Sequence, residues 1–337
     1  MGVGPLRFGM DSDEVKSALG GPLYGGGQVA ADGKSWDMYQ GTGLTCVYDR
    51  GMVLVAVAVD ALEGPLVRVG EVELIGRVPS EARAEIHELA LRQGRAVRVN
   101  WNGDPEIAAW GLSMDTALKW GVSAEGHLDR GETMITSALF VGPDLADDPY
   151  ASAPIMHWRD VRGLEKNPGA WPVTPDHDRA RWEWVPLERV GPLRFGMTPP
   201  EVAAVLAGEV PAGRMGHFPF WWHAKDGEWN LCEDRFEKTG VNALYSTCQD
   251  GIPRLGAVTV HSRTGPQVPY AGIPLVGRTP SALDAALLQH IEDHDLGLLF
   301  DPNGGPVPDG LNLSVSVGRA GDVAVSEPTF CAEHWEM

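Results

Sequence analysis

The sequence predicts an α+β fold made of two tandem homologous domains, each an antiparallel sheet packed with two helices. Two observations lead to this prediction. The segment VGPLRFGM at residues 3–10 returns unchanged at residues 190–197, and eight identical residues in a row do not arise by chance in unrelated segments. Strand-like and helix-like segments then follow each copy in the same order. A repeat on this scale indicates a duplicated structural unit.

The spacing between the copies changes along the chain. The opening segments are 187 positions apart (190 − 3), whereas Arg77 and its counterpart Arg278 are 201 apart. The second copy therefore carries a net insertion of 14 residues (201 − 187) before residue 265. The stretch 213–237, with its run His-Phe-Pro-Phe-Trp-Trp-His, is the expected place for it.

These landmarks predict the domain limits. We expect domain one over residues 1–142, a connector rich in proline and tryptophan over 143–188, and domain two over 189–337, with the aromatic insertion around 213–237. A chain of 337 residues suits two domains of roughly 150 residues, each large enough for its own core. A free linker would not carry four indoles, so the connector is expected to pack onto the domains. Its tryptophans are Trp158, Trp171, Trp182 and Trp184.

Each copy opens with a short strand and a helix whose start is a capping box, Asp11 to Glu14 in the first and Thr198 to Glu201 in the second. Two strands, a second helix and three more strands are expected to follow, giving the order β-α-β-β-α-β-β-β. In the first copy these are strands 44–48 and 53–59, helix 80–93, and strands 96–101, 112–120 and 134–141; in the second, strands 241–248 and 255–261, helix 280–294, and strands 297–300, 311–317 and 323–326. The three glycines at 25–27 are expected to form a flexible turn.

The formal net charge of −19 argues against a nucleic-acid or anionic-membrane partner, because both would be repelled. It fits a basic partner or simple solubility. No apolar stretch approaches the ~20 residues needed to span a bilayer. The first repeat begins at Val3, which leaves no room for a signal peptide, so a cytoplasmic protein is expected. The four cysteines form no CxxC pair and are expected to be reduced, mostly buried thiols.

Two clusters of metal-ligand residue types stand out, although no cofactor is expected. His290 and His294 are spaced i, i+4 on a predicted helix beside Asp293, which puts both imidazoles on one face and could contribute to a metal site. A solvated polar helix end is the other interpretation. Cys331 and His334 could join Cys232 or Cys248 around zinc, but the sequence has no second close-spaced ligand pair. No motif for nucleophilic catalysis is present.

Aromatic side chains in the insertion are the strongest candidates for binding a partner. Phe218, Phe220, Trp221 and Trp222 fall in a segment that only the second copy has. Large aromatic side chains dominate interface hot spots because they desolvate large areas at low entropy cost. The alternative is that these rings cover the sheet or the domain junction.

The repeated Gly-Pro-Leu-Arg-Phe-Gly-Met is followed by a capped helix with Glu-Val and a Leu-Gly or Leu-Ala-Gly end, over residues 4–20 and 191–208. This combination resembles the helix entry of the small BamE/SmpA-like lipoprotein domains. The duplicated α+β build resembles that of the tandem beta-lactamase inhibitor protein. The chain departs from the lipoprotein pattern in lacking a lipoprotein signal and in having much longer repeats. The resemblance implies a duplicated α+β module used for protein binding.

Together these observations predict a non-enzymatic bacterial binding protein. The acidic charge, the duplicated modules and the resemblance favour an immunity or inhibitor protein that neutralises a basic toxin by occluding its active surface. Two alternatives stay open. One is a metal-dependent enzyme using the cluster of His290 and His294, and the other is a scaffold subunit of a larger assembly.

Overall fold

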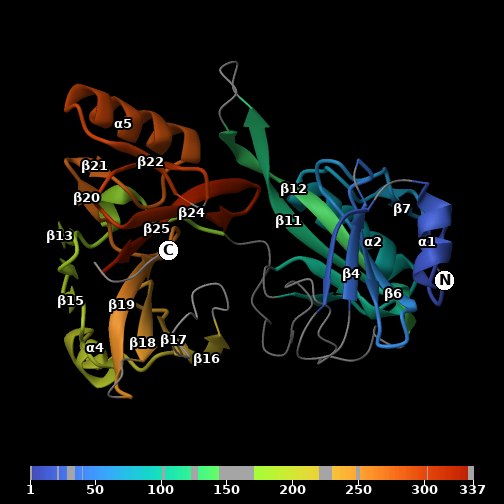
Figure 1. Cartoon of the computed structure of the whole chain (residues 1–337), viewed down its shortest axis with the longest axis horizontal. Coiled ribbons are helices and arrows are strands. Elements are labelled where there is room, and N and C mark those ends of the chain that lie inside the picture. Colours follow the sequence, from blue (N-terminus) through green and yellow to red (C-terminus); the bar gives the residue numbers. More distant parts are fainter. Residues whose placement is uncertain are drawn as a thin grey trace. The chain divides into compact units, whose positions relative to one another are not determined.

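The chain divides into two compact units in the computed structural model (Figure 1). Unit 1 comprises Met1–Lys119 with Thr133–Ala170, and unit 2 comprises Trp120–Glu132 with Trp171–Met337. Both combine helices with antiparallel sheets, so the predicted α+β class is confirmed. The described residues are 2–20, 23–28, 35–39, 41–100, 103–122, 128–143, 171–219, 230–247, 251–301 and 303–332.

Unit 1 is built on an antiparallel sheet in the order β3-β4-β5-β6-β12, continued beyond β12 by β11, β10 and β9. The helices are α1 (Ser12–Leu19) and α2 (Pro79–Arg92), with a 3-10 turn at Ala108–Trp110. The strands are β1 (Gly2–Val3), β2 (Leu6–Arg7), β3 (Leu23–Gln28), β4 (Ser35–Tyr39), β5 (Leu44–Tyr48), β6 (Leu54–Val59), β7 (Arg68–Val69), β8 (Val72–Glu73), β9 (Arg98–Val99), β10 (Pro105–Ile107), β11 (Leu112–Val122) and β12 (Leu128–Val141).

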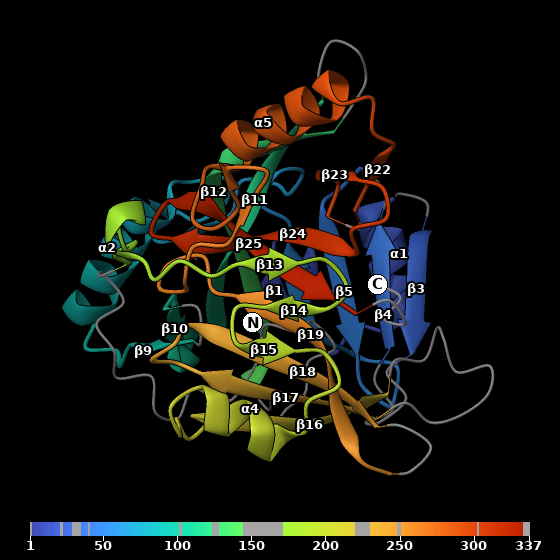
Figure 2. The ribbon, with the colours of Figure 1, turned by 90° about the vertical axis from the view of Figure 1, so that its left-hand side faces the viewer.

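Unit 2 has a sheet in the order β16-β17-β18-β19-β25-β24, and its elements from β14 to β25 follow the order of β1 to β12. Figure 2 shows α4 near β16–β19 and α5 near β24 and β25. The helices are α4 (Pro199–Val205) and α5 (Pro280–Asp293), with a 3-10 turn at Asp176–Asp178. The strands are β13 (Trp184–Val185), β14 (Arg189–Val190), β15 (Leu193–Arg194), β16 (Gly213–Pro219), β17 (Asn230–Phe236), β18 (Val241–Thr247), β19 (Pro253–Val260), β20 (Pro269–Tyr270), β21 (Ile273–Pro274), β22 (Leu298–Phe300), β23 (Pro306–Pro308), β24 (Leu313–Ala320) and β25 (Val323–Cys331).

The predicted helix starts are confirmed. The Asp11 carboxylate accepts from the Glu14 N–H at 2.9 Å while Glu14 accepts from the Asp11 N–H at 3.0 Å, which satisfies two backbone donors that the helix itself leaves free. At α4 the Glu201 carboxylate accepts from both the N–H and the hydroxyl of Thr198. These bonds lower the pKa of Glu201.

Each unit has its own hydrophobic core, and the predicted helical spacings supply it. Ile86 and Leu89 of α2 are buried in the first core, and Leu283, Leu287 and Ile291 of α5 are buried in unit 2. Because these residues recur every three or four positions, one stripe of each helix faces the sheet and the opposite stripe stays in water.

Besides several strands of two or three residues, two longer strands in each unit are missing from the predicted order, β3 and β4 in unit 1 and β16 and β17 in unit 2. The glycines at 25–27 lie within β3, which pairs antiparallel with β4 through Gly25–Met38 and Gly27–Trp36, so the expected flexible turn is wrong. In unit 2, β16 and β17 pair in the same way. Glycine is normally depleted in strands, and backbone ladder bonds rather than side-chain pattern hold this segment extended.

The described end of the connector packs onto unit 2. Arg179 is buried and donates to the backbone carbonyls of Gly265 at 2.6 Å and Ser262 at 2.8 Å. Trp184 is buried with its ring 4.8 Å from that of Phe330. Burying a guanidinium requires such acceptors, since an unpaired buried charge is very costly. The expectation of a packed connector is confirmed for residues 171–188.

A pair of glycines closes the same corner of each unit. An added Cβ on Gly43 would lie 2.3 Å from the Gly64 nitrogen, and one on Gly240 would lie 2.7 Å from that of Gly265. The positions of these pairs also show where the 14 extra residues of the second copy fall. Gly240 lies 197 positions after Gly43 (240 − 43), so 10 of the extra residues (197 − 187) come before it and 4 (201 − 197) fall between Gly240 and Gly265.

Replacing Gly43 by alanine should destabilise unit 1 by roughly 2–4 kcal/mol, because a left-handed φ of +58° adds strain to a clash with backbone. Gly41 is the matched control, since its φ is +68° and nothing lies within 4 Å of an added Cβ. Gly41→Ala should cost only about 1 kcal/mol. Urea unfolding of the full chain measures both. Equal losses would contradict the contact argument.

Candidate functional site

Of the four aromatic residues predicted to bind a partner, the structure describes only the backbone of Phe218. Phe218 lies in β16 and pairs with Leu231 in the ladder to β17. Its side chain lies outside the described residues, as do Phe220, Trp221 and Trp222 in full. Their role as anchors stays a prediction.

The two histidines predicted to share a helix face do lie together at the end of α5. Their ring centroids are 4.2 Å apart with the planes tilted by 39°. His294 Nδ1 lies 2.9 Å from the His290 carbonyl, and the Asp293 carboxylate accepts from Gln289 at 2.8 Å. Among the described residues no group of three or more His, Cys, Asp or Glu could hold a metal ion.

The described cysteines behave as the sequence predicts. Cys46 and Cys331 are unpaired and buried, and burial raises the pKa of each thiol to about 12. The side chains of Cys232 and Cys248, and the whole of His334, lie outside the described residues. The suggested zinc group around Cys331 therefore stays a prediction.

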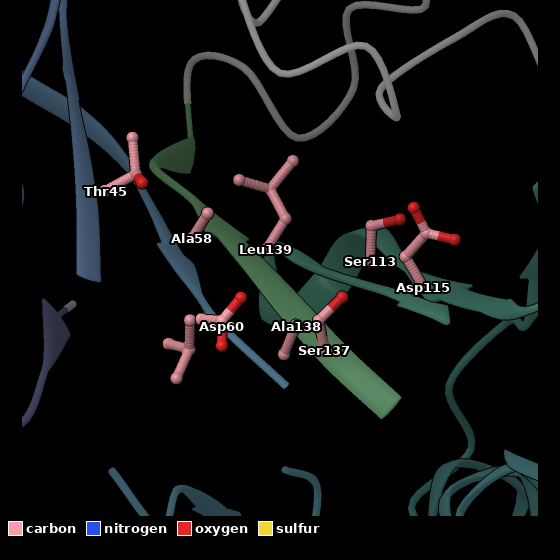
Figure 3. A pocket seen from close by; sticks show the side chains of 9 residues that line it. Thr45, Ala58, Asp60, Ser113, Asp115, Ser137, Ala138 and Leu139 are labelled. Carbon is pink, nitrogen blue, oxygen red and sulfur yellow. The ribbon is translucent and has the colours of Figure 1, made fainter. Parts of the chain in front are cut away.

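Unit 1 has a small cavity lined by residues from β5, β6, β11 and β12, several of them polar (Figure 3). Alternation along β11 explains it, because Leu112 and Met114 enter the core while Ser113 and Asp115 point to the opposite face. The cavity volume is about 160 Å³, below the roughly 300 Å³ at which ligand pockets usually begin. Its other lining residues are Thr45, Ala58, Val59, Asp60, Ser137, Ala138 and Leu139.

A buried carboxyl group lies one hydrogen bond from this cavity. Glu106 of β10 is 2% exposed and pairs across the ladder with Ser113, whose hydroxyl donates to Glu106 Oε1 at 3.2 Å. Desolvation by burial raises the pKa of Glu106 to about 7, against a smaller opposing effect of Arg98. Such a group can exchange a proton near neutral pH. The signal that could have led to Glu106 from sequence is weak, namely the polar Ser113 between the apolar Leu112 and Met114 on the strand that pairs with it.

Unit 2 presents an exposed apolar segment that the sequence analysis did not single out. Leu298 and Leu299 of β22 are 42% and 50% exposed, and Phe300 is 53% exposed. Leu296, just before the strand, is also exposed. We call these four residues the β22 patch. Their counterparts in unit 1 lie 201 positions earlier, and Val97 there packs against the core.

Acidic side chains border the β22 patch. Glu292, Asp293 and Asp295 at the end of α5 are exposed, and so is Asp309. Asp309 lies across from the patch, since its N–H donates to the Gly297 carbonyl at 2.8 Å. The four exposed apolar residues thus follow the acidic end of α5 in the chain, with Asp309 opposite Gly297, a combination that suits an apolar contact on a basic partner.

No family model, curated protein or solved structure matches this chain. No helix among the described residues is long and apolar enough to cross a membrane.

Glu106 should make the stability of unit 1 fall as pH rises. Its folded pKa of about 7 lies above its ordinary value of 4.5, so between these values only the folded state resists ionisation. The contribution of this group is therefore fully present at and below pH 4.5, falls by up to ~3 kcal/mol between pH 4.5 and 7, and changes no further above that. Glu106→Gln should remove this slope and be the more stable protein at pH 8.

Urea unfolding of the full chain at pH 5, 6, 7 and 8 tests this. Glu63→Gln, at an exposed position in the same unit, is the control and should keep the wild-type slope. A Glu106→Gln variant with an unchanged slope would show that this carboxyl is not protonated in the folded protein at pH 5 to 7.

Proposed function

We propose that the chain is a non-enzymatic protein-binding protein, an immunity or inhibitor protein that neutralises a basic bacterial toxin by occluding its active surface. The observation that carries the proposal is the β22 patch with its acidic border. Soluble proteins rarely leave neighbouring leucines and a phenylalanine exposed unless a partner covers them. The net charge of −19 supports a basic partner in particular.

The two parts of this surface serve different steps of binding. Long-range attraction between an acidic protein and a basic partner raises the association rate and weakens with salt. Leucine and phenylalanine side chains that lose water on contact slow the dissociation of the complex.

We also propose that the two units descend from one duplicated module, the two tandem homologous domains of the sequence prediction. The support is the shared element order, the two capping boxes and the matching glycine pairs at Gly43–Gly64 and Gly240–Gly265. Among the described residues the exposed apolar segment occurs in unit 2 and not at the equivalent positions of unit 1, so a duplication followed by specialisation of one copy accounts for both the likeness and the difference.

The neighbouring rings of His290 and His294 keep the metal-dependent enzyme as the second candidate. The metal content of the purified protein distinguishes this candidate from the first. Purified enzyme of this kind would retain about one metal ion per chain, whereas an inhibitor needs none. A scaffold subunit would also bind protein, but its partners need not be basic or salt-sensitive.

Full-length tagged protein should capture a basic protein from its native lysate in near-stoichiometric amount, and release it as salt rises from about 50 to 500 mM. Leu298→Ser with Leu299→Ser should weaken that complex at least tenfold, since buried interface anchors typically contribute over 1 kcal/mol each. Val210→Ser, at an 83% exposed position elsewhere in unit 2, is the control and should bind normally.

A triple alanine variant at Phe220, Trp221 and Trp222 tests the anchors predicted from sequence in the same titration. Loss of affinity in this variant alone would move the site from the β22 patch to the insertion. Capture that depends on neither set and ignores salt would overturn the proposed function.

A further inference from the structure

The β11–β12 hairpin is longer than its counterpart in unit 2. At the base of each hairpin one backbone bond closes the same position, Val141 N–H to the Gly111 carbonyl at 2.7 Å and Cys331 N–H to the Asn312 carbonyl at 3.0 Å. These bonds span 30 residues (141 − 111) and 19 residues (331 − 312), a difference of 11. The extra length falls in residues 120–132, which belong to unit 2. Of these residues the structure describes 120–122 and 128–132, and we call residues 128–132 the arm.

The arm carries an arginine that is completely enclosed by unit 2. Arg130 is 1% exposed, and its guanidinium forms a two-point pair with Asp284 of α5, with Nε donating to Oδ2 at 3.0 Å and Nη2 contacting Oδ1. Nη1 donates to the carbonyl of Val315 in β24. Parallel two-point contacts of this kind are selective for arginine, because lysine offers no planar fork.

Gly305 completes the enclosure because it lacks a side chain. An added Cβ there would lie 2.8 to 2.9 Å from the three terminal guanidinium atoms of Arg130. Asp301 fixes this glycine, since its carboxylate accepts from the N–H of Gly305 at 2.8 Å and from the N–H of Val315. Asp284, Gly305 and the Val315 carbonyl therefore form a recess around the guanidinium, which we call the arginine slot.

The two slot residues Asp284 and Gly305 have no equivalents at the matching positions of unit 1. With the 201-residue offset, Arg83 stands where unit 2 has Asp284, and Asp104 stands where it has Gly305. A cation replaces the carboxylate that would bind a guanidinium, and a side chain replaces the gap that admits it. The slot and the longer hairpin are thus two departures from the repeat that fit each other.

We propose that the arginine slot is a binding site for the guanidinium side chain of an arginine in an extended segment, and that Arg130 fills it from within the chain. The arm is then an internal occupant that an external arginine replaces when the arm leaves. If the proposed function holds, a surface arginine of the basic partner is that external group, and this last step rests on the proposed function.

The test uses the full chain with Arg130→Ala and N-acetyl-arginine amide as the probe. The slot of this variant is empty and leaves Asp284 without its arginine, so the variant should unfold at lower temperature than wild type. Added probe should raise that temperature saturably. At ten times its dissociation constant the probe should increase the folding equilibrium constant roughly tenfold. Wild type, with its slot filled, should not respond.

Two double variants serve as matched controls. Arg130→Ala with Asp284→Asn removes the carboxylate, and Arg130→Ala with Gly305→Ala fills the gap, so neither should respond to the probe. N-acetyl-lysine amide should act far more weakly than the arginine probe on Arg130→Ala. If Arg130→Ala does not fold, its refolding in the presence of the arginine probe is measured instead, where recovery of folded protein with the arginine but not the lysine probe supports the slot and no recovery with either overturns it.

A folded Arg130→Ala variant that ignores the probe, or double variants that respond as strongly, would overturn the slot. This result is independent of any partner, so it is distinguishable from failure of the proposed function. A working slot together with partner affinity that is the same in wild type and Arg130→Ala would keep the binding site and remove its connection to the partner.

Discussion

The carboxylate of Asp301 holds together the part of unit 2 on which both binding proposals depend. It accepts from the N–H groups of Asn303 and Gly305, from the Ser314 hydroxyl and from the N–H of Val315. Hydrogen bonds to a charged acceptor contribute about 1.5–3 kcal/mol each. Asp301 directly follows β22, so its carboxylate fixes the backbone at the end of the β22 patch. The same carboxylate holds Gly305 and Val315, which line the arginine slot.

In unit 1 a neutral side chain holds the backbone at the equivalent position. Asn100 occupies the position of Asp301, and its amide accepts from the Asp104 N–H at 2.9 Å and donates to the Met114 carbonyl at 2.8 Å. The backbone frame is thus kept while the charges change. Where unit 1 has the buried carboxyl of Glu106, unit 2 has the buried apolar side chain of Val307. One frame therefore supports two surfaces with different chemistry.

Sequence patterns predicted the parts of the fold that local rules specify. The capping boxes at Asp11 and Thr198 and the buried stripe of α5 follow from spacing alone. Strands β3, β4, β16 and β17 were missed because their extended backbone depends on pairing with a neighbour rather than on a side-chain pattern. The β22 patch, Glu106 and the arginine slot were missed for a related reason. Exposure, a shifted pKa and an ion pair between residues 130 and 284 are products of tertiary packing.

The buried cysteines allow the opening of each unit to be measured separately. Only a thiolate attacks an alkylating reagent, and Cys46 in unit 1 and Cys331 in unit 2 each have a pKa near 12. In the folded protein at neutral pH both sulfurs are therefore chemically silent, and each gains its ordinary reactivity only when its own unit opens. The alkylation rate of Cys46 therefore reports the opening of unit 1, and that of Cys331 reports the opening of unit 2. Peptide mass analysis after timed alkylation measures both rates in one native sample.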